Sequence, residues 1–185
     1  YSMGGPIIGF FNNQYPQRVK SLALIAPAGF ASLDAVSSKN SLMYYPLIGG
    51  WFFNVFRNRF KNMLMPESGD SEDVKAINQK EYEILFTEQF QYEGYIEALL
   101  STLRNFNLLS VLEMYSSIGK TQKPVLAIWG RLDGVVAFSG SEQLKQSIPH
   151  AELIVIEEGT HDITYRQPSQ VSEAIVKFLL NQKTD

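Results

Sequence analysis

The chain has 185 residues, of which 45% are hydrophobic, 19% charged and 12% aromatic, and its formal net charge is −3. This composition is typical of a globular protein, and the acidic balance argues against a nucleic-acid partner, whose binding needs clustered Lys and Arg. The chain contains no cysteine and two histidines, so disulfides and Cys-ligated metals are excluded and no His-rich metal spacing is present. No apolar run reaches the roughly 20 residues that span a bilayer.

The chain opens on the sequence YSMGG, which has the pattern of a tight turn between a strand and a helix. Gly4 and Gly5 leave room for backbones to pass close to such a turn, and Pro6 suits the first turn of the helix that follows. We therefore expect this turn to hold the hydroxyl of Ser2 clear of the sheet, beyond the end of the strand that precedes the turn.

Three short runs are apolar almost throughout, as in strands buried on both faces of a parallel sheet: residues 19–26, 124–130 and 151–156. Helical spacing of apolar residues predicts helices over 6–15, 141–148 and 168–180. Ser169 is a candidate N-cap of the last helix. Strand and helix signals at both ends of the chain indicate an α/β fold.

Between these parts, over residues 31–119, strand signals disappear and aromatic residues become frequent, which predicts an inserted all-helical domain. Ser71 is a candidate N-cap for one of its helices. A single aromatic side chain there is most simply core, but the group exceeds what small helices bury. We therefore take Trp51, Phe53 and Phe56 as candidate substrate contacts.

Three polar residues each follow a strand or the position of one: Ser2, Asp133 and His161. The carboxyl ends of parallel strands open on one edge of a sheet, so residues far apart in sequence can converge there. A serine hydroxyl becomes a good nucleophile when a histidine takes its proton, and the histidine needs a carboxylate to orient it. His150 is a rival base at the opposite end of the next strand, and Asp162 is a rival carboxylate.

Four segments carry a resemblance to a known family: YSMGG, YPQRVKSLALIAPAG, PVLAIWGRLDGVV and EEGTHDITYRQP. They resemble the C-terminal portion of an α/β-hydrolase-fold serine hydrolase, of the lipase, esterase and carbon–carbon hydrolase group with a helical cap. The order Ser, Asp, His is the order of that family. The resemblance implies that Ser2 is the nucleophile, His161 the general base and Asp133 its orienting acid, and that the backbone N–H of Met3 forms half of the oxyanion hole.

The resemblance also implies hydrolysis of an ester, thioester or related acyl bond in a largely apolar substrate, without metal or organic cofactor. Carbon–carbon cleavage of ring-fission products with the same residues, and a non-catalytic binding module, are the alternatives. A serine at position 2 argues against the haloalkane dehalogenase and epoxide hydrolase branches, which use aspartate. Many relatives place a Glu near Arg166, so a structural ion pair at that position is in doubt.

The chain begins inside a motif, which predicts that the N-terminal part of the hydrolase core lies on a preceding segment or a companion chain. The expected division is a core of residues 1–30 and 120–185 with a cap of 31–119. Without the preceding part, the run 19–26 would be a bare apolar edge strand, so we expect residues 1–185 alone to self-associate and to be inactive. Any signal peptide would precede Tyr1; the absence of cysteine favours the cytoplasm.

Overall fold

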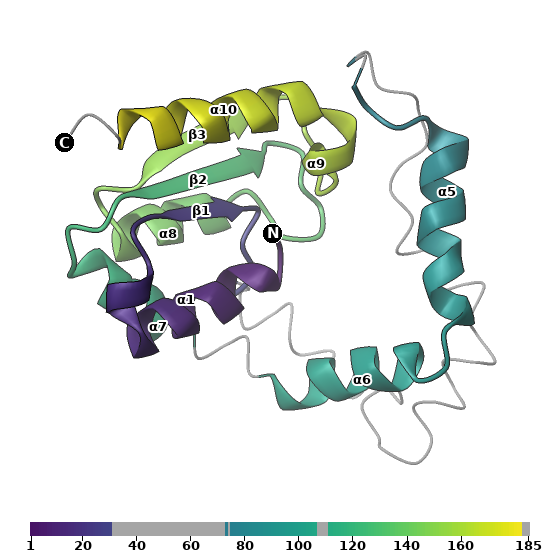
Figure 1. Ribbon diagram of the computed structural model, residues 1–185, viewed down its shortest axis with the longest axis horizontal. Helices are drawn as coiled ribbons and strands as arrows, with labels where there is room; N and C mark the ends of the chain where they lie inside the picture. Colours follow the sequence, from purple (N-terminus) through teal and green to yellow (C-terminus); the bar gives the residue numbers. More distant parts are fainter. Residues whose placement is uncertain (31–72, 74, 107–110, 183–185) are drawn as a thin grey trace. The chain divides into compact units, whose positions relative to one another are not determined.

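The computed structural model describes residues 1–30, 73, 75–106 and 111–182, which fall into two compact units (Figure 1). We call them the sheet unit, with described residues 1–30, 73, 75–76 and 111–182, and the helical unit, with residues 77–106.

The sheet unit is built on three parallel strands in the order β1-β2-β3. They are β1 (Leu22–Ile25), β2 (Val125–Gly130) and β3 (Glu152–Ile156). In the register, Leu24 lies beside Ala127, and Ile128 lies beside Ile154. Every residue of β2 is buried because the strand is central and covered on both faces. The three apolar runs of the sequence thus form the parallel α/β sheet that they predict.

Helices cover both faces of this sheet (Figure 1). On one face lie α1 (Gly4–Gln14), α7 (Leu112–Gly119) and α8 (Gly140–Ser147); on the other lie α9 (Ile163–Arg166) and α10 (Pro168–Asn181). A short 3-10 turn, η1 (Pro16–Arg18), joins α1 to β1. Alternate residues of β2 enter opposite clusters, with Trp129 on the α7 side and Ile128 on the α10 side. The two buried clusters hold the strand ends in fixed positions.

Helix α7 corrects the expected bounds of the helical insertion, which we placed at residues 31–119. The sheet unit contains α7, and it buries Val111, Met114, Tyr115 and Ile118 in the cluster beneath β1 and β2. These residues have the i, i+3, i+4, i+7 spacing of a helix packed on a core. The Tyr115 hydroxyl also donates to the carbonyl of Ala28 at 3.0 Å, and burial raises the pKa of that hydroxyl.

Helix α1 forms where the sequence predicts it but packs through its small residues. Gly5 and Gly9 are buried, and a Cβ on Gly9 would overlap the side chain of Met114 on α7. The large apolar side chains of α1 are exposed instead: Ile7, Ile8, Phe10 and Phe11. The apolar spacing of this helix therefore marks an outward face rather than the face packed on the sheet.

The helical unit contains α5 (Gln79–Glu88), the 3-10 turn η4 (Gln89–Gln91) and α6 (Tyr95–Asn105). Asn78 caps α5 by accepting the backbone N–H of Glu81 at 2.8 Å. Phe90, Ile96 and Leu100 form its described buried cluster. The predicted cap Ser71 and the predicted substrate contacts Trp51, Phe53 and Phe56 lie outside the described residues.

Helix α10 begins differently from the prediction. Pro168 occupies its first position, and Ser169 does not cap it through an intrahelical side-chain bond. Instead the backbone N–H and the hydroxyl of Ser169 each donate to one carboxylate oxygen of Asp73, both at 2.8 Å. A carboxylate from a distant segment therefore satisfies an N–H at this helix start, where negative charge is also favoured by the helix dipole.

Candidate active site

Ser2 lies on the turn that leads into α1, in a backbone conformation that non-glycine residues rarely adopt. Its φ is +51°, in the left-handed region, which costs free energy and persists where the surrounding structure fixes it. Two bonds fix it here: the Ser2 N–H donates to the Ile25 carbonyl at 2.9 Å, and the Ala28 N–H donates to the Ser2 carbonyl at 3.0 Å. The end of β1 thus holds the hydroxyl of Ser2 at the carboxyl edge of the sheet.

Gly5 provides the close approach that the sequence predicts for this turn. A Cβ on Gly5 would lie 2.6 Å from the Cβ of Pro27, so any larger residue would push α1 away from the segment after β1. Gly4 has no described atom within 4 Å of an added Cβ, so among the described residues the close contact falls to Gly5 alone.

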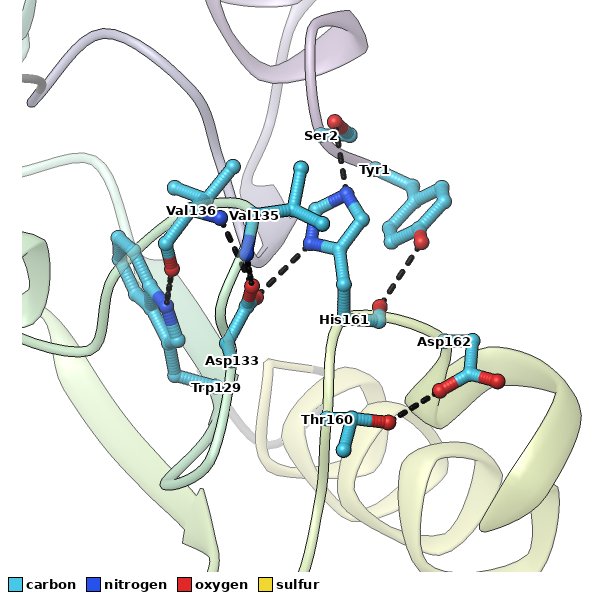
Figure 2. A network of polar contacts seen from close by, with 9 residues as sticks. All are labelled: Tyr1, Ser2, Trp129, Asp133, Val135, Val136, Thr160, His161 and Asp162. Carbon is cyan, nitrogen blue, oxygen red and sulfur yellow. Dashed lines mark hydrogen bonds and ion pairs between the residues drawn. The ribbon is translucent and has the colours of Figure 1, made fainter. Parts of the chain in front are cut away.

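Asp133 lies in the loop after β2 and is held by several bonds at once. Its Oδ1 accepts the backbone N–H groups of Val135 at 2.9 Å and Val136 at 2.7 Å (Figure 2). The indole N–H of Trp129, buried in β2, donates to the Val136 carbonyl at 2.9 Å and secures the same loop. The Asp133 side chain is fully buried, and its second oxygen is left to face His161.

His161 joins the other two residues into one chain of hydrogen bonds. Its Nδ1 lies 2.8 Å from Asp133 Oδ2, and its Nε2 lies 3.0 Å from Ser2 Oγ (Figure 2). A carboxylate can only accept, so Nδ1 carries the proton, and in the neutral ring Nε2 then accepts from the Ser2 hydroxyl. The structure thus brings together Ser2, His161 and Asp133, with the imidazole in the tautomer that can take a proton from serine.

Two glycines let the loops that carry Asp133 and His161 approach each other. A Cβ on Gly130, the last residue of β2, would overlap the carbonyl of Gly159, which precedes His161 by two positions. The Leu132 N–H also donates to that carbonyl at 2.8 Å.

Beside these loops, Arg131 and Glu157 form a bidentate ion pair, which raises the pKa of the Arg131 guanidinium and lowers the pKa of the Glu157 carboxyl. This pair is exposed and adds little stability.

The hydrogen bonds that the structure shows for the two rival residues go to groups other than Ser2 and the His161 ring. His150 precedes β3 and its Nε2 lies 2.9 Å from the carbonyl of Lys123. The carboxylate of Asp162 accepts from the hydroxyl of Thr160 and, at 3.1 Å, from the Nε of Arg166. Asp162 and Arg166 are both buried and four residues apart, so the ion pair that the sequence left in doubt is present, with Asp162 as the partner.

Met3 follows Ser2 at the start of α1. The N–H groups of Ser2, Gly4 and Gly5 each donate to a backbone carbonyl. Among the described residues, the N–H of Met3 has no such acceptor. An unused N–H beside a serine hydroxyl is suited to bind an oxyanion.

Sequence reasoning missed three contacts in and around this site. Trp129 was assigned only to a buried strand, and its donation to Val136 depends on how the Asp133 loop folds. Tyr1 donates from its hydroxyl to the carbonyl of His161 at 2.8 Å, a contact across the whole chain that no local pattern shows. The Asp162–Arg166 pair had a signal in the sequence, since opposite charges four residues apart face each other on a helix.

The fold and this site have the form of an α/β hydrolase, and the comparisons agree. A family model for the alpha/beta hydrolase fold matches residues 1–167, so the chain belongs to the α/β-hydrolase fold family. Over 199 aligned residues it is 25% identical to the monoacylglycerol lipase abhd6-B of Xenopus laevis, covering 100% of this chain and 55% of that protein. The chain spans about half the length of the curated relatives it matches.

Solved structures show the same fold. A carboxylesterase structure from the thaumarchaeon Nitrososphaera gargenis matches with a TM-score of 0.71 and 18% identity, covering 100% of this chain and 64% of that one. The haloalkane dehalogenase DbeA of Bradyrhizobium elkani matches with a TM-score of 0.74 and 15% identity, covering 99% and 66%. Neighbours with different activities match equally well, so the likeness establishes the fold alone.

In the part of the chain that the structure describes, no helix is long and apolar enough to cross a membrane.

Proposed function

We propose that this chain carries the catalytic residues of a serine hydrolase that cleaves an ester, thioester or related acyl bond of a largely apolar substrate. The observation that carries the proposal is the hydrogen-bonded chain from Ser2 Oγ through His161 to Asp133, with bonds of 3.0 and 2.8 Å. The kinship with a monoacylglycerol lipase supports an ester as substrate and favours it over a carbon–carbon bond.

In the first half of the proposed reaction, Ser2 Oγ attacks the carbonyl carbon while His161 Nε2 takes the hydroxyl proton. Asp133 keeps the ring oriented through Nδ1 and stabilises the positive charge that develops on it. The carbonyl oxygen gains negative charge, and in this proposal the N–H of Met3 donates to it as half of the oxyanion hole. The bond to the leaving group then breaks, and Nε2–H gives its proton to the departing oxygen or sulfur, which leaves an acyl group on Ser2.

In the second half, a water molecule attacks the acyl carbon and gives its proton to His161 Nε2. The bond between Ser2 Oγ and the acyl carbon breaks, the carboxylic acid leaves, and the proton returns to Ser2 Oγ. The cycle consumes the substrate and one water and regenerates all three side chains. Asp133 acts throughout as a carboxylate that three accepted hydrogen bonds hold in place.

The test is a fluorophosphonate probe together with a panel of aryl esters and monoacylglycerols. It uses the protein that contains this chain at its natural length, with the variants Ser2→Ala and Ser117→Ala; Ser117 is an exposed serine on α7 and serves as the matched control. We expect the probe to label Ser2, and Ser2→Ala to lose both labelling and nearly all turnover while Ser117→Ala keeps both.

Three results would contradict the proposal. Turnover that survives in Ser2→Ala would exclude Ser2 as the nucleophile. Absence of both labelling and ester turnover in the folded parent protein would favour a binding module. Activity on ring-fission products without activity on esters would favour the carbon–carbon alternative.

A further inference from the structure

We propose that Tyr1 is a positioning residue that keeps His161 aligned with Ser2 through the reaction; this inference rests on the function proposed above. Its hydroxyl donates to the backbone carbonyl of His161 at 2.8 Å. Its ring lies against the imidazole, with ring centroids 5.0 Å apart and planes inclined by 31° (Figure 2).

Tyr1 and Ser2 are neighbours, so the turn and the His161 loop are joined by two bridges. One runs between side chains, from Ser2 Oγ to His161 Nε2 at 3.0 Å. The other runs from the Tyr1 hydroxyl to the main chain of His161. The first bridge fixes the tip of the imidazole and the second fixes the backbone from which it projects, so together they set both the distance and the direction of the ring.

The two bridges differ in what the reaction does to them. Once Ser2 Oγ carries an acyl group it has no proton to donate, so the side-chain bridge is lost while His161 must still activate water. The bridge from Tyr1 uses no reacting atom and therefore persists in the acyl-enzyme. In the acyl-enzyme, the bond from Nδ1 to Asp133 is the one side-chain hydrogen bond among the described residues that still holds the imidazole. The Tyr1 ring, which lies against one face of the imidazole, restricts the rotation of the imidazole. Tyr1 thus helps to position His161 during deacylation, when Ser2 no longer donates a hydrogen bond to it.

This role predicts a loss in turnover rather than in substrate binding. The net value of one hydrogen bond corresponds to about a threefold to tenfold change in rate. We expect Tyr1→Phe, which removes the hydroxyl and keeps the ring, to lower kcat by that factor with little change in KM. Tyr1→Leu, which removes both contacts, lowers kcat further.

The experiment measures kcat, KM and single-turnover deacylation of an aryl ester in the protein that contains this chain at its natural length. Tyr15→Phe is the matched control, because Tyr15 is 38% exposed against 41% for Tyr1 and lies at the other end of α1. A spectroscopic readout accompanies the kinetics: the low-field proton NMR resonance of His161 Nδ1–H, whose exchange with water we expect to quicken in Tyr1→Phe and not in Tyr15→Phe.

Three outcomes would overturn the inference. Kinetics and proton exchange of Tyr1→Phe equal to those of Tyr15→Phe would show that the hydroxyl positions nothing. A lowered Tm or failure to fold with unchanged exchange in the folded fraction would make Tyr1 a purely structural residue. A raised KM with constant kcat would make it a substrate contact. Retained turnover in Ser2→Ala would instead refute the proposed function, so the two failures are distinguishable.

Discussion

The sheet unit and the helical unit differ in how their described residues are held. In the sheet unit, buried clusters cover both faces of a three-stranded sheet, and Ser2, Asp133 and His161 lie on the loops at its strand ends. In the helical unit, three buried side chains form the described cluster, and the partly buried Phe86 and Tyr95 pack edge to face against one of them, Phe90. Ser2, Asp133 and His161 therefore lie on the part whose described residues form two buried clusters, whereas the predicted substrate contacts belong to the segment expected as a cap.

The largest expected effect tests the fixed part of this comparison. Asp133→Asn leaves the shape of the loop but favours the wrong His161 tautomer, and we expect ester turnover to fall by about 10⁴-fold. Asp162→Asn is the matched control, because Asp162 bonds Thr160 and Arg166 rather than the His161 ring. Steady-state kinetics with one aryl ester measure both variants. If Asp162→Asn lost more turnover than Asp133→Asn, the carboxylate that orients His161 would be Asp162 and not Asp133.

The second prediction compares stability in the two units with one chemical change. Leu126 in β2 is 0% exposed and Leu100 in α6 is 3% exposed. Truncating a buried leucine to alanine costs about 2–5 kcal/mol, more where the surroundings cannot relax into the cavity. We expect Leu126→Ala near the upper end of this range and Leu100→Ala near the lower end. Urea unfolding, monitored by hydrogen exchange in each unit, measures the loss in the free energy of unfolding for each variant. Equal losses would contradict the predicted difference in packing between the units.

The third prediction concerns substrate preference. We expect each of three variants to shift the preference among acyl chain lengths more than it changes kcat for the best ester. The variants are Trp51→Ala, Phe53→Ala and Phe56→Ala. One methylene in an apolar pocket is worth about 1–3 kcal/mol, so the ratios of kcat/KM shift by modest factors. Phe86→Ala is the control, since Phe86 packs against Phe90 within the helical unit. If all three variants kept the parent profile, these aromatic residues would be core.

The sheet and the convergence of Ser2, Asp133 and His161 could be predicted because both follow from simple rules. A strand buried on both faces has to be apolar throughout, and parallel strands end on one edge. Helix α7 was misassigned although Val111, Met114 and Ile118 have helical spacing, because spacing does not say which core a helix joins. Similarly, the exposed Phe10 of α1 shows that an apolar stripe need not face its own unit.

Contacts that span the chain were beyond prediction. The bond from Tyr1 to His161 joins residues 160 positions apart, and the carboxylate at the start of α10 comes from 96 positions upstream. Ser169 had the residue type of an N-cap, but Pro168 took the first helical position and left Ser169 as a donor to Asp73. Such pairings depend on how whole loops are placed, which residue type and local spacing do not determine.

The smallest expected effect concerns this Asp73 contact and depends on pH. The Asp73 carboxylate accepts the N–H of Lys75 and then the N–H and hydroxyl of Ser169, and these bonds lower its pKa in the folded protein. A carboxyl whose pKa is lower when folded stabilises the protein above its unfolded pKa, and loses that contribution as the pH falls through its folded pKa. Asp73→Ala should therefore lower Tm at neutral pH by a small amount.

That loss should shrink as the pH falls below about 4, the ordinary pKa of an Asp carboxyl in an unfolded chain. It should vanish below the lower pKa of the folded Asp73 carboxyl, where the parent protein is protonated as well. Glu173→Ala, which removes an exposed carboxylate further along α10, is the control and should change Tm little at either pH. Thermal unfolding followed by circular dichroism across this pH range separates the two variants. A Tm difference for Asp73→Ala that stayed constant with pH would mean that the contact stabilises α10 by packing rather than by the charge of its carboxylate.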